Sequence, residues 1–245
     1  MENEEKVLFL VTSAIKVPTG DVMQRYAETL STINSINNKF KNCDIWLLES
    51  GSSFTEEVSS LFPPNVKLID FWKDPKLIDF IKESKEFADH QVKLYKNDWK
   101  FFYLGYVKNV TESYVLDQIF SNNDFSEYAR IFKLSGRYCL TPTFDPLSFN
   151  SENKFTIYKA IKTNQGKSKI RHYHLCFLWS CCGKEIETLK KVIKGVKKDV
   201  HELMAKREFI DIEHALYKNI PQSKKQEISK LGVYAKVNGE NWLFV

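Results

Sequence analysis

The N-terminal 71 residues alternate apolar runs with amphipathic segments, and this order constrains the fold more than any other feature of the chain. Residues 6–14, 44–49 and 66–71 are apolar runs of the length of buried strands. Between them, residues 22–38 carry apolar side chains at helical spacing. Residues 53–62 begin with Ser53 and Glu56 at the spacing of a helix capping box. A strand-helix-strand-helix-strand order predicts a right-handed, mainly parallel sheet.

The rest of the chain extends this α/β pattern. We expect a long helical region over residues 74–119, broken near 103–106, and a central strand over residues 131–134. Further strands are expected at 155–161 and 173–180, and further helices at 184–207 and 208–217. Residues 232–245 alternate around Asn238-Gly239, which is typical of a hairpin. The sequence therefore predicts one α/β unit, in which a mostly parallel central sheet is flanked by helices and followed by a C-terminal helical and hairpin elaboration.

Composition limits the class of partner. A hydrophobic content of 43% and an aromatic content of 14% argue against disorder. The net charge of +5 results from 36 basic and 31 acidic residues, so the surface is mixed, and this favours a phosphate-bearing substrate over nucleic acid. Five irregularly spaced cysteines suit a reducing compartment. We expect a cytoplasmic protein with no nucleic-acid partner and at most peripheral contact with a membrane.

A glycine-bearing turn follows the central strand and carries several polar side chains. Lys133 lies within the strand, and the turn itself comprises Ser135, Gly136, Arg137 and Tyr138. Open α/β sheets bind ligands at the carboxyl ends of their strands, and cationic groups with a tyrosine hydroxyl suit a phosphate or diphosphate. The alternative is an ordinary strand end with solvated charges.

A second polar segment lies late in the chain. Asp211, Glu213 and His214 stand within an otherwise apolar stretch. Glu213 or Asp211 could act as a general base, and His214 could bind phosphate or transfer a proton. The alternative is a helix start, where acidic residues favour the positive end of the helix dipole.

Two other patterns have a structural interpretation that we favour. The alternating His172, His174 and Cys176 could offer ligands to zinc, but packed side chains in a strand explain them as well. The lysine-rich helix over 184–207 is typical of a solvated surface, although it could also contact an anionic partner.

Six segments together resemble those of GT-A type nucleotide-sugar glycosyltransferases, in particular the small bacterial and viral transferases of surface-polysaccharide synthesis. They are the strand KVLFLVTSAI, the helix RYAETLSTI, the strand DIWLLES, and the segments KNVTE (108–112), KLSGRY (133–138) and IEHALY (212–217). The similarity covers most of the chain as an order of elements. It implies a single GT-A-like domain over 1–245, with a nucleotide-binding half at 1–140 and an acceptor-binding and catalytic half at 141–245.

The resemblance also implies roles for individual residues. Thr12, Ser13 and Glu49, at the ends of the first two strands, would bind the nucleotide. Arg25, Lys108 and Arg137 would offset the charge of the diphosphate. Glu112, four residues from Lys108 on the same helix face, joins the substrate-binding set with Lys133, Ser135, Gly136 and Tyr138. Glu213 would be the catalytic base, with Asp211 as the alternative and His214 beside them. The implied partners are a nucleotide-sugar donor and a glycan or lipid-linked acceptor.

One departure from the family pattern concerns the metal. GT-A enzymes commonly carry an Asp-x-Asp after the central strand to hold a divalent cation, and this chain has Ser135-Gly136-Arg137 there. Either ligands for manganese or magnesium lie elsewhere, or Lys133 and Arg137 replace the metal in stabilising the diphosphate. The residue types favour the second explanation, so we assign no metal ligand.

Two other functions remain open at this stage. A methyltransferase that uses S-adenosylmethionine would place Glu49 on the ribose hydroxyls, but no glycine-rich loop follows the first strand. A nonenzymatic anion-binding module would use the lysine-rich helix, but it would leave the polar strand ends without a role.

Overall fold

The fold is described here from a computed structural model of the chain. It describes residues 6–16, 21–95, 99–150, 152, 154–163, 170–206, 208, 210–237 and 240–244. Within this part of the chain, no helix is both long enough and apolar enough to cross a membrane.

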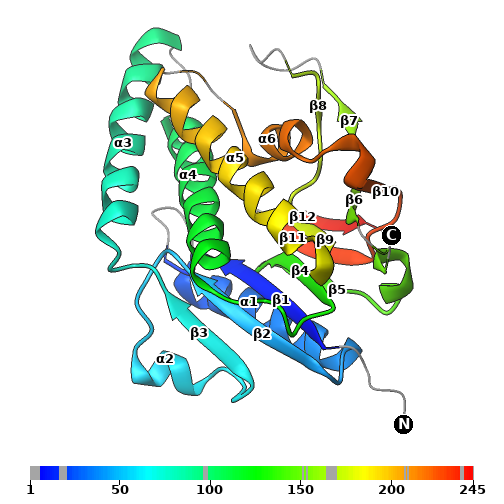
Figure 1. Cartoon of the computed structure of the whole chain (residues 1–245). Coiled ribbons are helices and arrows are strands. Elements are labelled where there is room, and N and C mark those ends of the chain that lie inside the picture. The colour runs from blue at the N-terminus through cyan, green and yellow to red at the C-terminus, as the bar shows by residue number, and fades with distance from the viewer. Residues whose placement is uncertain are drawn as a thin grey trace.

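A seven-stranded sheet with the order β10-β6-β9-β4-β1-β2-β3 forms the centre of the molecule (Figure 1). Strands β1 (Val7–Ser13), β2 (Cys43–Glu49), β3 (Val66–Asp70) and β4 (Arg130–Ser135) are parallel to one another. Strand β9 (Leu178–Cys182) runs antiparallel to β4 and to β6 (Phe155–Tyr158), and β10 (Lys225–Ile228) pairs in parallel with β6. The predicted mainly parallel sheet and its first three strands are confirmed.

Helices cover both faces of the sheet, and each face has its own apolar core. Helix α1 (Val22–Lys39), capped by Asp21, buries Ile33 and Ile36 against one face together with Phe9 and Val11 of β1. On the other face, α4 (Trp99–Asn122) and α5 (Ile186–Ala205) pack over Leu8 and Leu10, and α3 (Pro75–Tyr95) packs against α4 (Figure 1). Alternate residues of β1 thus face opposite layers, as the two-residue period of a strand requires.

Smaller elements complete the C-terminal half. An antiparallel sheet joins β5 (Tyr138–Leu140), β11 (Val233–Val237) and β12 (Glu240–Phe244), and a two-stranded sheet joins β7 (Ile161–Lys162) and β8 (His172–Tyr173). The remaining elements are α2 (Glu56–Ser60), α6 (Ile212–Asn219) and the 3-10 helices η1 (Pro146–Phe149), η2 (Gly183–Glu185) and η3 (Gln222–Lys224). The predicted hairpin pairing is confirmed, because Val237 pairs with Glu240. The predicted turn at Asn238-Gly239 lies outside the described residues.

Several predicted boundaries were wrong. The helical region does not break at 103–106, because these residues lie inside α4. A single glycine costs a helix about 1 kcal/mol, and burial of the Tyr106 and Val110 side chains in the core outweighs it. Helix α2 is capped by Thr55 rather than Ser53, and it ends at Ser60. The strand predicted at 155–161 is two strands, β6 and β7, and the one predicted at 173–180 is replaced by β8 and β9.

Candidate functional site

The carboxyl ends of β1, β2 and β4 lie side by side and form the edge at which the polar residues gather. Thr12 is in register with Ser135, and Ser13 with Glu49. The Gly136 N–H donates to the Thr12 carbonyl oxygen at 2.8 Å. A Cβ atom at Gly136 would lie 3.1 Å from that oxygen, so glycine allows the turn after β4 to approach β1 closely. The predicted position of the KLSGRY turn at the end of the central strand is confirmed, and the structure adds that this turn lies beside β1.

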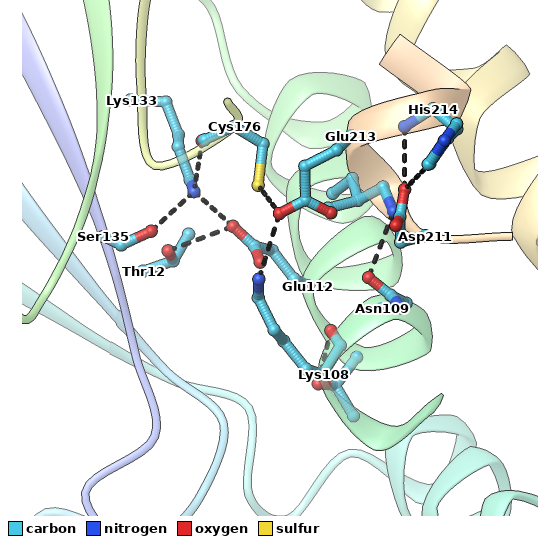
Figure 2. Close-up of polar contacts among 12 residues, drawn as sticks. Thr12, Lys108, Asn109, Glu112, Lys133, Ser135, Cys176, Asp211, Glu213 and His214 are labelled. Carbon is cyan, nitrogen blue, oxygen red and sulfur yellow. Dashed lines mark hydrogen bonds and ion pairs between the residues drawn. The ribbon is translucent and has the colours of Figure 1, made fainter. Parts of the chain in front are cut away.

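Lys133 and Glu112 form a buried ion pair beneath this edge (Figure 2). Only 1% of the Lys133 side chain is exposed, and its Nζ also donates to Ser135 Oγ and to the Cys176 carbonyl oxygen, both at 2.9 Å. Thr12 Oγ1 donates to Glu112 Oε1 at 3.3 Å. An ammonium group has three protons, and all three have acceptors here. The geometry therefore argues against the predicted contact of Lys133 with a diphosphate, and assigns this side chain to holding Glu112 and Ser135 in place.

Glu213 enters the same cluster from the first turn of α6 (Figure 2). Its Oε1 accepts a hydrogen bond from the Cys176 thiol at 2.9 Å and faces Lys108 Nζ at 3.3 Å. Glu213 raises the pKa of Lys108 well above its usual value. The other carboxylate oxygen, Oε2, makes no hydrogen bond with the part of the chain that the structure describes. One oxygen is thus held by two donors, while the other is left for a ligand.

Two contacts fix the helix that carries Glu213. Asp211 caps α6, because its Oδ1 accepts from the His214 backbone N–H at 2.8 Å. The Ile212 N–H donates to Oδ1 of Asn109, a buried side chain of α4, at 3.1 Å. These contacts set the direction in which the first turn of α6 presents its side chains. The alternative interpretation of this segment as a helix start is confirmed for Asp211.

His214 belongs to the cap rather than to the cluster. Its Nδ1 lies 2.5 Å from the same Oδ1 of Asp211, and this contact raises the pKa of His214. In Figure 2 the pair lies on the far side of Glu213 from Lys133. The Asp211 and His214 side chains therefore stabilise the start of α6. This role favours Glu213 over Asp211 as the candidate base.

Two arginines, Arg25 and Arg137, lie near the carboxyl ends of β1 and β4. Arg25 is half-buried in the first turns of α1, and its Nη1 donates to the Ala14 carbonyl oxygen at 3.4 Å. Burial lowers the pKa of Arg25, and the charge of Arg137 lowers it further. The Arg137 guanidinium has no hydrogen-bond or ion-pair partner among the described residues. Two guanidinium groups repel each other here, and one of them has no hydrogen-bond or ion-pair partner in the described part of the chain, so a bound anion would stabilise both.

Tyr138 links the arginines to the carboxylate cluster. Its ring stacks on Phe177 with centroids 4.2 Å apart and an interplanar angle of 5°. Burial raises the pKa of Tyr138, whereas Lys108 and Arg137 oppose this shift. Its hydroxyl is thus within electrostatic reach of both cations. A cavity of about 450 Å³ opens beside Arg137, between α1 and the small sheet. Its lining residues are Gln24, Ala27, Glu28, Ser31, Arg137, Cys139 and Tyr234.

Glu49 does not point into the site. Its side chain is fully buried, and Oε1 accepts from the backbone N–H groups of Ile15, Gly51 and Ser52 at 2.9, 2.7 and 3.1 Å. Burial raises the pKa of this carboxyl group. The geometry thus argues against the predicted contact of Glu49 with the nucleotide, because the carboxylate instead holds together the loops that follow β1 and β2. Ser13 remains at the edge, with its Oγ 3.4 Å from Thr29 Oγ1.

The residues at the expected metal position do not fit a divalent cation. At the turn after β4, Ser135 Oγ already accepts from Lys133, and Arg137 carries a positive charge. Within the described ranges, no three His, Cys, Asp or Glu side chains converge as metal ligands. The zinc alternative for His172, His174 and Cys176 was wrong, since His174 Nδ1 contacts the Tyr158 carbonyl oxygen at 2.8 Å and the Cys176 thiol turns to Glu213.

Sequence reasoning missed two contributors to the site. Asn109 carries no signal by itself, because its contact with α6 depends on the packing of residues more than a hundred positions apart. For Cys176, the sequence pattern indicated only a zinc ligand or a packed side chain. Its alternation with the two histidines indicated a shared strand face, but not that the thiol would meet a carboxylate from α6.

Comparison with known proteins finds similarity in structure but not in sequence. No family model and no curated protein matches the sequence. Among solved structures, core-mannan synthase A from Aspergillus fumigatus, in a form with manganese and GDP, superposes with a TM-score of 0.61 at 6% identity, over 95% of this chain and 74% of that chain. The galactosyltransferase LgtC, in complex with donor and acceptor sugar analogues, superposes with a TM-score of 0.50 at 9% identity, over 91% of this chain and 73% of that chain.

The chain has the GT-A fold. The predicted fold class is thereby confirmed. At identities of 6% and 9%, the structural similarity establishes the fold but not the activity, so the chemistry must be argued from this chain's own residues.

Proposed function

We propose that this protein is a glycosyltransferase that moves a sugar from a nucleotide-diphosphate donor to a hydroxyl group of an acceptor, in polysaccharide or glycan synthesis. One observation carries the proposal. At this edge of a GT-A sheet, one oxygen of the Glu213 carboxylate is anchored by Lys108 and Cys176, and the other makes no hydrogen bond with any described residue. A carboxylate in this state suits a general base that takes the proton of an acceptor hydroxyl.

The donor diphosphate would lie across the ends of β1 and β4. Arg137 and Arg25 supply positive charge there, and the Thr12 and Ser13 side chains border the same edge. When the bond between the sugar and the diphosphate breaks, negative charge grows on the leaving group. Preorganised cations at that point lower the barrier without any reorganisation during the reaction. Lys108, half-exposed beside Glu213, would add a further positive charge near the leaving group.

Arg137→Ala is expected to weaken donor binding or turnover about ten-fold or more while the fold stays intact. A charge-assisted contact contributes about 1.5 to 3 kcal/mol, and the Arg137 guanidinium makes no hydrogen bond or ion pair with the described residues that its removal would break. Isothermal titration with the best nucleotide checks the affinity, and a thermal melt checks the fold. An Arg137→Ala protein with parental affinity and turnover would remove this residue from the anion site.

Activity is expected to persist in the presence of a chelator. The expectation rests on residue types, because Ser135 and the cationic Arg137 stand where the GT-A pattern has two carboxylates. Transfer rates should agree within about two-fold with and without EDTA, since the charge stabilisation comes from side chains. Loss of transfer in EDTA that manganese or magnesium restores would contradict this prediction.

A thermal-shift screen tests the proposed function against its two rivals. A ligand that binds only the folded state raises the melting temperature, so nucleoside diphosphates and their sugars should stabilise the protein. Stabilisation by S-adenosylhomocysteine alone would favour the methyltransferase, although Glu49 is buried and engaged with backbone N–H groups. The binding-module alternative rests on α5, three of whose lysines already pair with carboxylates: Lys190 with Glu187, Lys197 with Asp117, and Lys198 with Glu202.

A further inference from the structure

Cys176 connects the two halves of the polar cluster. It lies between β8 and β9 and is 2% exposed. Its thiol donates to Glu213 Oε1 at 2.9 Å, and its backbone carbonyl oxygen accepts from Lys133 Nζ at 2.9 Å. The carboxylate from α6 and the buried ion pair beneath the strand ends thus meet at one residue (Figure 2).

The two donors to Glu213 Oε1 differ in rigidity. Lys108 has a long side chain that is 51% exposed, and its Nζ lies 3.3 Å from the carboxylate oxygen. Because this ammonium group is accessible to solvent, a diphosphate could compete with Glu213 for it. The Cys176 side chain is short and buried, so its thiol has less freedom to leave the carboxylate than the long, half-exposed Lys108 side chain has. Burial raises the pKa of this thiol well above its usual value, and the negative charge of Glu213 adds to the shift, so it stays a protonated donor.

We propose that Cys176 is a positioning residue that fixes Oε1 of Glu213 and thereby directs Oε2 toward the acceptor hydroxyl. The proposal rests on the proposed function. In the transfer step, the acceptor oxygen forms a bond to the anomeric carbon as the bond from that carbon to the diphosphate oxygen breaks. The hydroxyl proton moves to Oε2 of Glu213, and the electron pair of the broken bond leaves with the nucleoside diphosphate. The thiol keeps its proton throughout.

The rival explanation is that Cys176 only fills space. Cys181, which is also buried, provides a matched control, because its thiol contacts the Cys182 carbonyl oxygen at 3.4 Å and not the cluster. If burial alone matters, alanine at either position should lower the melting temperature and leave the chemistry unchanged. If the thiol positions the base, only the change at Cys176 should alter the rate and its pH dependence.

The experiment measures kcat, KM and the pH–rate profile of Cys176→Ala, Cys176→Ser and Cys181→Ala with the donor sugar that wild type uses. Cys176→Ala should lower kcat about five-fold to twenty-fold and leave the donor KM within about two-fold, as expected when an interaction with the base is lost. Its pH–rate profile should also differ from that of wild type, because the carboxylate has lost a hydrogen-bond donor. Cys176→Ser should restore most of the rate, and Cys181→Ala should match wild type.

An unchanged kcat and profile in a folded Cys176→Ala protein would overturn the proposal. If that variant does not fold, Cys176→Val decides the question, because valine fills the site without a donor: a wild-type profile contradicts the proposal, and a shifted one supports it. Glu213→Gln separates this proposal from the function itself. Failure of Glu213→Gln to slow transfer rejects Glu213 as the base, whereas a slow Glu213→Gln with an unaffected Cys176→Ala rejects only the role of the thiol.

Discussion

Glu213→Gln is expected to reduce turnover about a hundred-fold or more, in keeping with the contribution of a general base, while nucleotide affinity stays nearly unchanged. Glutamine keeps the size of the side chain and an oxygen that can accept from the Cys176 thiol. It removes the basic oxygen that would take the proton. Steady-state kinetics combined with titration of the nucleoside diphosphate separates the two effects.

Asp211→Asn is the control for this change. Asparagine caps a helix about as well as aspartate, so the hydrogen bond to the His214 N–H and the direction of α6 should be retained. Transfer by Asp211→Asn should stay within a few-fold of wild type. A Glu213→Gln protein that transfers sugar at the parental rate would exclude Glu213 as the base, and a large loss in Asp211→Asn would then point to Asp211.

Lys133→Met is expected to destabilise the fold by about 3–5 kcal/mol, the usual cost of breaking a buried ion pair by removing one partner. Glu112 would keep a buried negative charge without its cation, and Ser135 Oγ and the Cys176 carbonyl oxygen would lose a donor. Urea unfolding of wild type and variant measures the difference in free energy of unfolding.

Two further variants sharpen this test. Lys108→Met removes a half-exposed partner of Glu213 and should cost less than about 1 kcal/mol. The double variant Lys133→Met with Glu112→Leu should be more stable than Lys133→Met alone, because replacing both members of a buried pair by apolar groups is often close to neutral. A loss below 1 kcal/mol in Lys133→Met would show that the pair does not hold the strand ends.

The sequence was sufficient to predict those helices and strands whose apolar pattern lies within one segment of the chain. The apolar runs of β1, β2 and β3 and the helical spacing of α1 each lie within a single segment of the sequence, and all of these elements form as predicted. The KLSGRY turn could be located because a parallel sheet brings its carboxyl ends to one edge. The alternative interpretation of the segment around Asp211 as a helix start is also confirmed, although α6 begins at Ile212 and not at the predicted residue 208.

The direction of individual polar side chains could not be read in this way. Lys133 lies in an apolar strand, where a sequence cannot tell whether its ammonium group faces a ligand or a buried carboxylate from another helix. Glu49 lies at a strand end, the position expected of a nucleotide-binding residue. Its carboxylate instead accepts hydrogen bonds from three backbone N–H groups of the neighbouring loops. The contact of Cys176 with Glu213 joins residues 37 positions apart, and the packing of α6 against α5 and β8 brings them together.

Release of nucleoside diphosphate from a panel of nucleotide sugars, measured with purified wild type and Glu213→Gln, tests the central claim most directly. Uridine, guanosine and thymidine diphosphate sugars are incubated with and without simple saccharide acceptors, and the nucleotide and any glycosylated product are quantified by mass spectrometry. We expect wild type to release nucleoside diphosphate from at least one donor and to form the matching product. Glu213→Gln should bind the same donor but release nucleoside diphosphate about a hundred-fold more slowly. Absence of binding and of release across the whole panel, together with binding of S-adenosylmethionine, would contradict the assignment.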